Sequence, residues 1–143
     1  MTGLQERLTR QHRGLDTHLG RFLAAAQSGA VEPAREAMAA FDDELRRHMA
    51  LEEERLIPEA SGQGLATGRD ESDRERLGRE LRLEHVQVRE LSGMMRRVLE
   101  DTGDLAAALR LFPNLARRWD AHTEKEERSI LLSPPLDAAP PRP

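Results

Sequence analysis

Hydrophobic residues recur along much of the chain at the three- and four-residue spacing that gathers them on one side of an α-helix. The first such stretch covers roughly residues 4–27 and stops at Ser28 and Gly29, because glycine commonly ends helices. The second begins near Pro33, a favourable first-turn residue, and ends before Pro58. The pattern therefore predicts two helices joined by a short link.

A polar, glycine-rich segment at residues 61–70 follows and is predicted to form a loop. The third helix is predicted to start near Ser72, because Glu75 stands three residues later in the arrangement of a capping box. Its hydrophobic periodicity continues until Gly103, where the helix is predicted to stop.

The fourth predicted helix covers about residues 104–131 and contains Pro113, which is expected to kink it or to split off a short first segment. Residues 133–143 are rich in proline and are predicted to form a disordered tail. Residues 1–132 are therefore predicted to form one domain, long enough to bury a hydrophobic core.

The composition agrees with an all-α protein. Aromatic residues make up only 3% of the chain and tyrosine is absent, so strands are poorly supported, whereas leucine, alanine, glutamate and arginine favour helices. Because the link between the first two helices is short, these helices are expected to be antiparallel. The predicted fold class is an up-down-up-down antiparallel four-helix bundle.

Charge and cysteine content exclude several kinds of function. The 22 basic and 26 acidic residues are interleaved, so the chain has no basic patch for nucleic acid. No apolar run is long enough to span a membrane, and residues 1–11 do not resemble a signal peptide. The absence of cysteine excludes disulfides, zinc–thiolate sites and iron–sulfur ligation. We expect a cytoplasmic protein without a membrane or nucleic-acid partner.

The chain also contains an internal repeat. A histidine flanked by apolar residues on the first helix reappears 73 positions later on the third, and a His-x3-Glu-Glu motif on the second reappears 74 positions later on the fourth. The repeat predicts two related helical hairpins around a pseudo-two-fold axis. Its polar members are His12 and His85, followed by His48, Glu52 and Glu53 with His122, Glu126 and Glu127.

These repeated residues are the candidate metal ligands. A histidine and a glutamate four residues apart share one helix face, so four imidazoles and two carboxylates converge if the apolar faces point inward. Buried without partners, each group would cost about 1–3 kcal/mol, and metal ions would supply the partners. Each carboxylate can bridge two metals, and the donor types suit iron, manganese or zinc. The predicted ligands are His12, His48, Glu52, His85, His122 and Glu126.

A less specific interpretation uses the same residues. A single histidine on an apolar face is commonly a core residue, and a single His-x3-Glu pair is commonly a solvated i,i+4 pair. The occurrence of both elements twice, on matching helix faces, favours the metal site.

Four segments that carry these residues resemble the ligand-bearing helices of the hemerythrin-like, or HHE cation-binding, family. They read RQHRGLD, ELRRHMALEEERLIP, LRLEHVQVREL and RWDAHTEKEERSILL, and the resemblance extends over roughly residues 4–132. It implies a four-helix bundle with two iron ions joined by an oxo or hydroxo bridge, although other divalent metals remain possible. Members of the family bind or sense oxygen, nitric oxide or peroxide, handle iron, or help to repair iron–sulfur proteins.

One position departs from the pattern of the oxygen carriers. They have a second histidine on the third helix, where this chain has Arg89, which cannot donate a lone pair. This disfavours reversible oxygen carriage and favours sensing, redox or catalytic chemistry. Asp16 occupies the related position on the first helix, and we hypothesise that it adds an oxygen ligand or contacts Arg89 across the centre; alternatively, both are ordinary surface residues. Trp119 is expected to line the pocket, and Glu53 to orient a ligand or face solvent.

Four functional classes follow. The chain is predicted to be a di-iron protein that binds or senses oxygen, nitric oxide or peroxide. The alternatives are a peroxidase-like di-iron oxidoreductase, a protein that stores a divalent metal, and a structural bundle without metal. A metal-binding or sensing protein is favoured over an enzyme, and the sequence does not indicate which protein partner, if any, it has.

Overall fold

The computed structural model describes residues 3–60 and 71–131. All the regular structure in these two ranges is helical. The elements are α1 (Gly3–Gln27), α2 (Val31–Leu51), the π-helical segment η1 (Glu52–Leu56), α3 (Ile57–Ala60), α4 (Glu71–Thr102), α5 (Leu105–Glu126) and the π-helical segment η2 (Glu127–Leu131). The predicted loop at 61–70 and the predicted tail at 133–143 lie outside the described residues.

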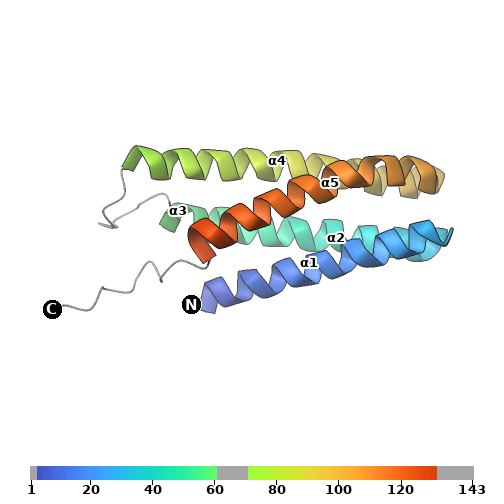
Figure 1. Cartoon of the computed structure of the whole chain (residues 1–143), viewed down its shortest axis with the longest axis horizontal. Helices are drawn as coiled ribbons and strands as arrows, with labels where there is room; N and C mark the ends of the chain where they lie inside the picture. The colour runs from blue at the N-terminus through green and yellow to red at the C-terminus, as the bar shows by residue number, and fades with distance from the viewer. Residues whose placement is uncertain (1–2, 61–70, 132–143) are drawn as a thin grey trace.

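Four long helices, α1, α2, α4 and α5, form the bundle, and consecutive helices run in opposite directions (Figure 1). Helix α1 packs along α2 and helix α4 along α5, while α2 contacts α4 and α1 contacts α5. Both tight turns, α1–α2 and α4–α5, lie at the same end of the bundle (Figure 1). The predicted antiparallel four-helix bundle is confirmed. No described helix has the length and hydropathy needed to cross a membrane.

Equivalent glycines make the two tight turns. Gly29 has a φ of 76° and Gly103 a φ of 64°, a left-handed backbone that residues with a side chain rarely adopt. After Gly103, the Asp104 carboxylate accepts a hydrogen bond of 3.0 Å from the backbone N–H of Ala107 and caps α5. The predicted helix stops at these glycines agree with the structure.

The structure corrects some details of the predicted helix boundaries. Helix α4 already includes Glu71, so Ser72 lies inside the helix rather than at its N-cap. Helix α2 begins at Val31, so Pro33 lies in its first turn as predicted, but helical structure does not end before Pro58, because α3 includes this proline. Helix α5 runs unbroken through Pro113, so no short first segment splits off. The packing of a long apolar face holds the α5 helix together despite the hydrogen bond that proline removes.

A polar layer separates two hydrophobic clusters along the bundle axis. The larger cluster fills the part nearer the tight turns, and the smaller contains Leu8, Leu56, Ile57 and Leu81. On α1, His12 stands between Leu8 of the smaller cluster and Leu15 of the larger one. On α4, His85 stands likewise between Leu81 of the smaller cluster and Val88 of the larger one.

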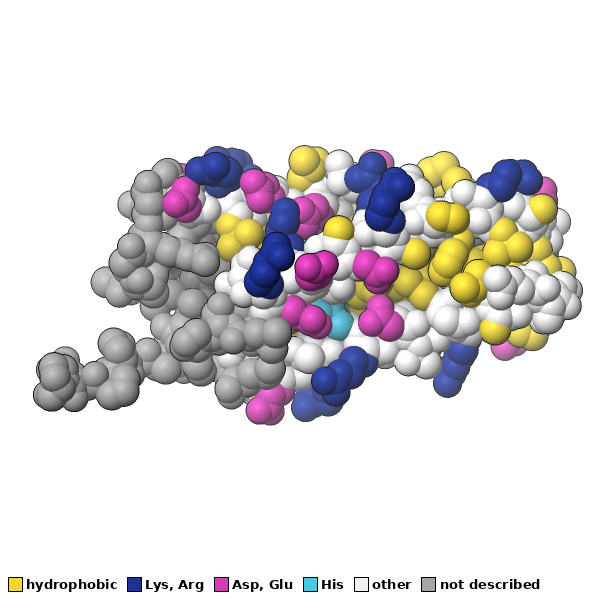
Figure 2. Space-filling model, in the orientation of Figure 1, with side chains coloured by type: hydrophobic (Ala, Val, Ile, Leu, Met, Phe, Trp, Pro, Cys, Tyr) yellow, Lys and Arg dark blue, Asp and Glu magenta, His cyan; other side chains and the backbone are white. Residues whose placement is uncertain are grey.

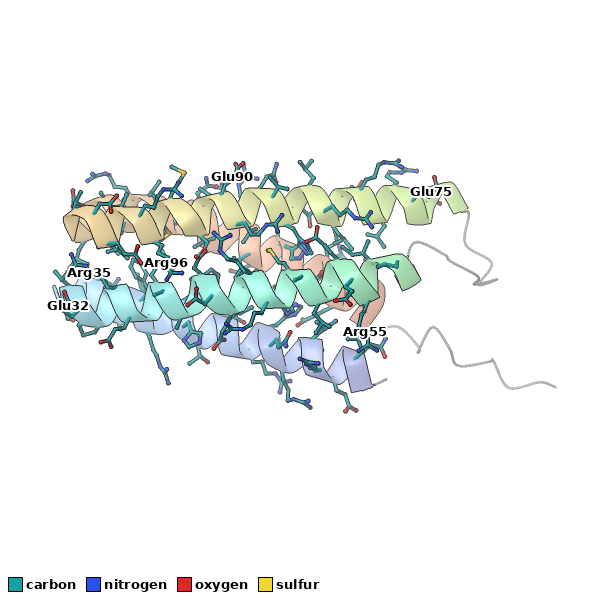
Figure 3. All side chains as sticks on the ribbon, turned by 180° about the vertical axis from the view of Figure 1, so that it is seen from behind. Glu32, Arg35, Arg55, Glu75, Glu90 and Arg96 are labelled. Atoms are coloured by element: carbon teal, nitrogen blue, oxygen red, sulfur yellow. The ribbon has the colours of Figure 1, made fainter. Side chains whose placement is uncertain are left out.

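A buried carboxylate also links the two hairpins. Asp42 on α2 accepts hydrogen bonds from Ser92 (2.7 Å) and Arg96 (3.0 Å) on α4, and from Arg46 (3.2 Å) on its own helix. Figure 3 shows Arg96 lying between α4 and α2. Burial alone would raise the pKa of Asp42, but these hydrogen bonds lower it. The ionised Asp42 therefore fixes how α2 and α4 pack.

Candidate metal centre

The polar layer contains six buried side chains that converge from all four long helices. Helices α1 and α4 contribute one histidine each, and helices α2 and α5 contribute a histidine and the glutamate that follows it by one helical turn. All six have relative exposures of 2% or less. They are His12, His48, Glu52, His85, His122 and Glu126.

These residues form two overlapping groups of metal donors. One contains His12 and His48, the other contains His85 and His122, and Glu52 and Glu126 belong to both. Within each group the donor atoms all lie within 4.8 Å of one another. The arrangement is therefore a pair of adjacent four-donor sites that share both carboxylates.

The shared carboxylates lie between the two histidine pairs. Oε1 of Glu126 is 3.1 Å from Nε2 of His12, and Oε2 of Glu126 is 3.2 Å from Nε2 of His122. Oε1 of Glu52 is 3.2 Å from Nε2 of His48 and 3.1 Å from Nε2 of His85. Each carboxylate thus reaches one histidine of each site, as a bridging ligand must.

Several polar atoms of this cluster have no hydrogen-bond partner, and these atoms show whether metal ions fit the site. Among the described residues, Nε2 of His48, Oε2 of Glu52, Nε2 of His122 and Oε2 of Glu126 are buried atoms without a hydrogen-bond partner. Buried polar atoms normally have partners, because leaving one unsatisfied costs about 1–3 kcal/mol. Nitrogen and carboxylate oxygen donors aimed at a common centre fit a pair of metal ions.

Protonated histidines of the cluster supply positive charge at the place where metal ions would supply it. Burial lowers the pKa of His122, but the carboxylates of Glu126, Glu52 and Glu84 outweigh it and raise that pKa to about 11. The pKa values of His12 and His85 are also raised: burial opposes protonation, and Glu126 and Glu52 favour it more strongly. Without metal, protonated imidazoles therefore compensate only part of the buried carboxylate charge, because Oε2 of Glu52 and of Glu126 still lack hydrogen-bond partners.

The outer nitrogens of His12 and His85 face carboxylates from the opposite hairpin. Nδ1 of His12 lies 3.2 Å from Oε1 of Glu127, and Nδ1 of His85 lies 3.7 Å from Oε2 of Glu53. Glu53 therefore lies beside a candidate ligand, as the sequence suggested. These two contacts connect α1 to η2 and α4 to η1, so each hairpin supports a histidine of the other.

The outer nitrogens of His48 and His122 have partners that the sequence reasoning missed. Nδ1 of His48 donates to Gln11 Oε1 at 2.7 Å, and Nδ1 of His122 donates to Glu84 Oε1 at 2.8 Å. Gln11 and Glu84 each precede a candidate ligand and stand 73 positions apart, so the repeat contained the signal. Lys125 also donates a hydrogen bond to Glu84. The partner of His48 is thus a neutral amide, whereas the partner of His122 is a carboxylate paired with a lysine.

Both His-x3-Glu motifs run into π-helical turns. Segment η1 begins at Glu52, and η2 begins at Glu127, directly after Glu126. π-Helical turns occur frequently at functional sites. Here they begin at the shared carboxylate (Glu52) in one hairpin and directly after it (Glu126) in the other, and they contain Glu53 and Glu127, the residues beside His85 and His12.

Asp16 is paired with Trp119 and Arg89 with Glu53, rather than with each other. Oδ1 of Asp16 accepts a hydrogen bond of 2.8 Å from Nε1 of Trp119. Nη1 of Arg89 lies 3.8 Å from Oε2 of Glu53. Asp16 therefore contacts the centre through Trp119, and Arg89 contacts it through Glu53, which itself lies beside His85.

Trp119 covers the side of the centre nearest the larger hydrophobic cluster. Its ring is fully buried, and its centroid lies 5.5 Å from that of His12, 6.0 Å from that of His48 and 6.2 Å from that of His122. Trp119 therefore lies against candidate ligands of both donor groups.

Acidic side chains lie above the centre on the face formed by α1 and α5. Figure 2 shows several of them around one visible histidine side chain. Asp16 on α1 and Asp120 on α5 are both exposed. Partial burial and the nearby Asp16 carboxylate raise the pKa of Asp120, so the two carboxylates are neighbours on this face.

Comparison with known proteins identifies one family. The model of the family described as Hemerythrin HHE cation binding domain matches residues 3–132. The comparisons with curated proteins and with solved structures gave no match.

Proposed function

The chain belongs to the hemerythrin HHE cation-binding family, and from that premise we propose that it is a non-haem di-iron protein that binds or senses a small oxidant or diatomic molecule. Oxygen, nitric oxide and peroxide are the candidate ligands. The observation that carries the proposal is the pair of adjacent buried donor groups that share Glu52 and Glu126.

The donor types are compatible with iron, and the two donor groups suggest which residues would hold each ion. His12 and His48 would hold one ion, His85 and His122 the other, and both glutamates would bridge. Each iron would receive two nitrogens and two oxygens from the protein. Octahedral coordination needs about six donors, so positions would stay open at each iron. A bound iron pair supplies open positions for a small molecule and electrons for its reduction.

The remaining residues orient the ligands and exclude water. Because Nδ1 of His48 and of His122 donates outward, to Gln11 and to Glu84, the Nε2 lone pair of each ring is directed to the metal. A carboxylate partner also makes its imidazole a stronger electron donor than an amide partner does. Trp119 and the two hydrophobic clusters enclose the site.

Arg89 favours sensing or redox chemistry over reversible oxygen carriage. Its guanidinium has no lone pair to offer and lies beside Glu53. The irons would then have equal numbers of protein donors, without the additional histidine of the oxygen carriers. The same observation favours a peroxidase-like oxidoreductase as the second candidate function.

Metal analysis of protein from iron-replete cells tests the proposal. We expect close to two irons per chain and near-UV and visible charge-transfer bands of a bridged diferric centre. His48→Gln should lose iron and these bands, whereas His18→Gln should keep both, because His18 pairs with Glu44 outside the cluster. Iron well below one per chain in the unmodified protein would overturn the proposal.

The small molecule is tested on the loaded protein. A spectral change with oxygen or nitric oxide and no turnover supports a binding or sensing role. Repeated turnover of hydrogen peroxide with a reductant supports the oxidoreductase. Iron that is taken up and released without reaction with any of the three would indicate a metal-handling protein instead.

A further inference from the structure

Trp119 is the only redox-active aromatic residue of the chain. The sequence contains one tryptophan, no tyrosine and no cysteine. The indole is fully buried and meets the rings of His12 and His48 edge-on. An oxidisable ring therefore contacts both candidate histidine ligands of one metal position directly, and its centroid lies 6.2 Å from that of His122 of the other position.

The hydrogen bond of the indole ends on a carboxylate. Nε1 of Trp119 donates to Oδ1 of Asp16 at 2.8 Å. A buried tryptophan needs a partner for its N–H group, and a backbone carbonyl would satisfy it equally well. A carboxylate differs because it can accept the proton when the ring is oxidised. Asp16 is exposed, so a proton received there can pass to solvent.

The arrangement occurs in one hairpin only. The repeat places Leu45 at the position that corresponds to Trp119, and Arg89 at the position that corresponds to Asp16. Leu45 is as fully buried as Trp119, so a leucine can fill such a position. Packing alone therefore does not require an indole with a carboxylate partner.

We propose that Trp119 donates one electron to the metal centre and that Asp16 accepts the indole proton. The inference rests on the proposed function, because it requires a redox-active metal pair. An electron leaves the indole, the N–H bond of Trp119 breaks, and the proton moves to Oδ1 of Asp16. The product is a neutral tryptophan radical.

The oxidant is hydrogen peroxide, whose O–O bond accepts two electrons and two protons to give two water molecules. One electron comes from the ferrous ion of a mixed-valence pair, and the other comes from Trp119. One proton is released through Asp16, and the other comes from solvent. Trp119 thus completes the reduction of peroxide when the metals hold only one electron.

Rapid freeze-quench EPR tests the proposal. Iron-loaded protein in the mixed-valence state is mixed with hydrogen peroxide, with and without deuterated tryptophan. We expect a radical signal that narrows on deuteration and that disappears in Trp119→Phe. Asp16→Asn keeps a hydrogen-bond acceptor but is a poor proton acceptor, so its radical yield should fall several-fold. Asp120→Asn is the matched control and should keep the signal.

Two further measurements make the result decisive. Iron content and charge-transfer bands should be unchanged in all three variants, because none replaces a ligand. Mass spectrometry after peroxide treatment should find oxygen added at Trp119, and less of it in Asp16→Asn. Absence of a radical in protein with two irons, or an equal signal in Trp119→Phe or Asp16→Asn, overturns the inference. Failure to bind iron overturns the proposed function as well.

Discussion

Removing the metals should destabilise the fold by several kcal/mol. Four buried donor atoms that face the centre lack hydrogen-bond partners: Nε2 of His48 and of His122, and Oε2 of Glu52 and of Glu126. Metal ions satisfy such atoms in the folded chain and find no formed site in the unfolded one. Their binding free energy therefore adds to the free energy of unfolding.

The size of the effect follows from these atoms. At about 1 kcal/mol each, the lower end for an unsatisfied buried polar group, the metals should stabilise the protein by at least about 4 kcal/mol. The free energy of unfolding of a domain is typically about 5–15 kcal/mol, so this contribution would be a large part of it. For a chain of this length, about 1 kcal/mol corresponds to roughly 4 °C, so the melting temperature should rise by about 15 °C.

The assay is thermal unfolding followed by far-UV circular dichroism, with metal removed by a chelator and then restored. His18→Gln should show the full shift, and Glu52→Gln should show little, since it lacks one shared carboxylate. Metal analysis of every sample establishes occupancy. A rise of less than about 3 °C in fully loaded protein would refute the reasoning, because it would mean that the four atoms are already satisfied without metal.

Three further predictions follow from the structure. Asp42→Ala should lower the free energy of unfolding in urea by about 3 kcal/mol, and Asp43→Ala, an exposed neighbour, by under about 0.5 kcal/mol. The pKa of His122 is 6.5 unfolded and about 11 folded. In metal-free protein the stabilisation that His122 contributes should therefore be present in full below pH 6.5 and be lost as the pH rises toward 11, measured by urea unfolding at several pH values. Iron added to metal-free protein should quench the fluorescence of Trp119, saturating near two irons per chain.

The fold was predictable because local and long-range signals agree. The three- and four-residue periodicity defines the long helices, and Gly29 and Gly103 mark both tight turns by the left-handed backbone they allow. The repeat then brings the candidate ligands to one level of the bundle. His12 and His85 each stand between members of the two hydrophobic clusters, a position that a sequence alone can indicate.

The sequence could not predict the directions in which individual side chains point. Position alone could not show that Asp16 turns to Trp119 and Arg89 to Glu53, because each has several neighbours within reach of a long or rotatable side chain. The π-helical turns η1 and η2 were also missed, since they depend on packing rather than on a residue pattern. The partners of the outer histidine nitrogens were within reach: comparing the repeats one residue before each histidine would have found Gln11 and Glu84.

The two hairpins have kept identical donors while differing immediately around them. Gln11 in the first hairpin offers an amide to His48, whereas Glu84 in the second hairpin offers a carboxylate to His122. Two matching halves would give both ions of the proposed centre the same surroundings. Here the surroundings would differ, so a redox-active metal would change oxidation state more readily at one position than at the other. The differences between the hairpins can thus give the two ions separate tasks although their protein ligands are the same.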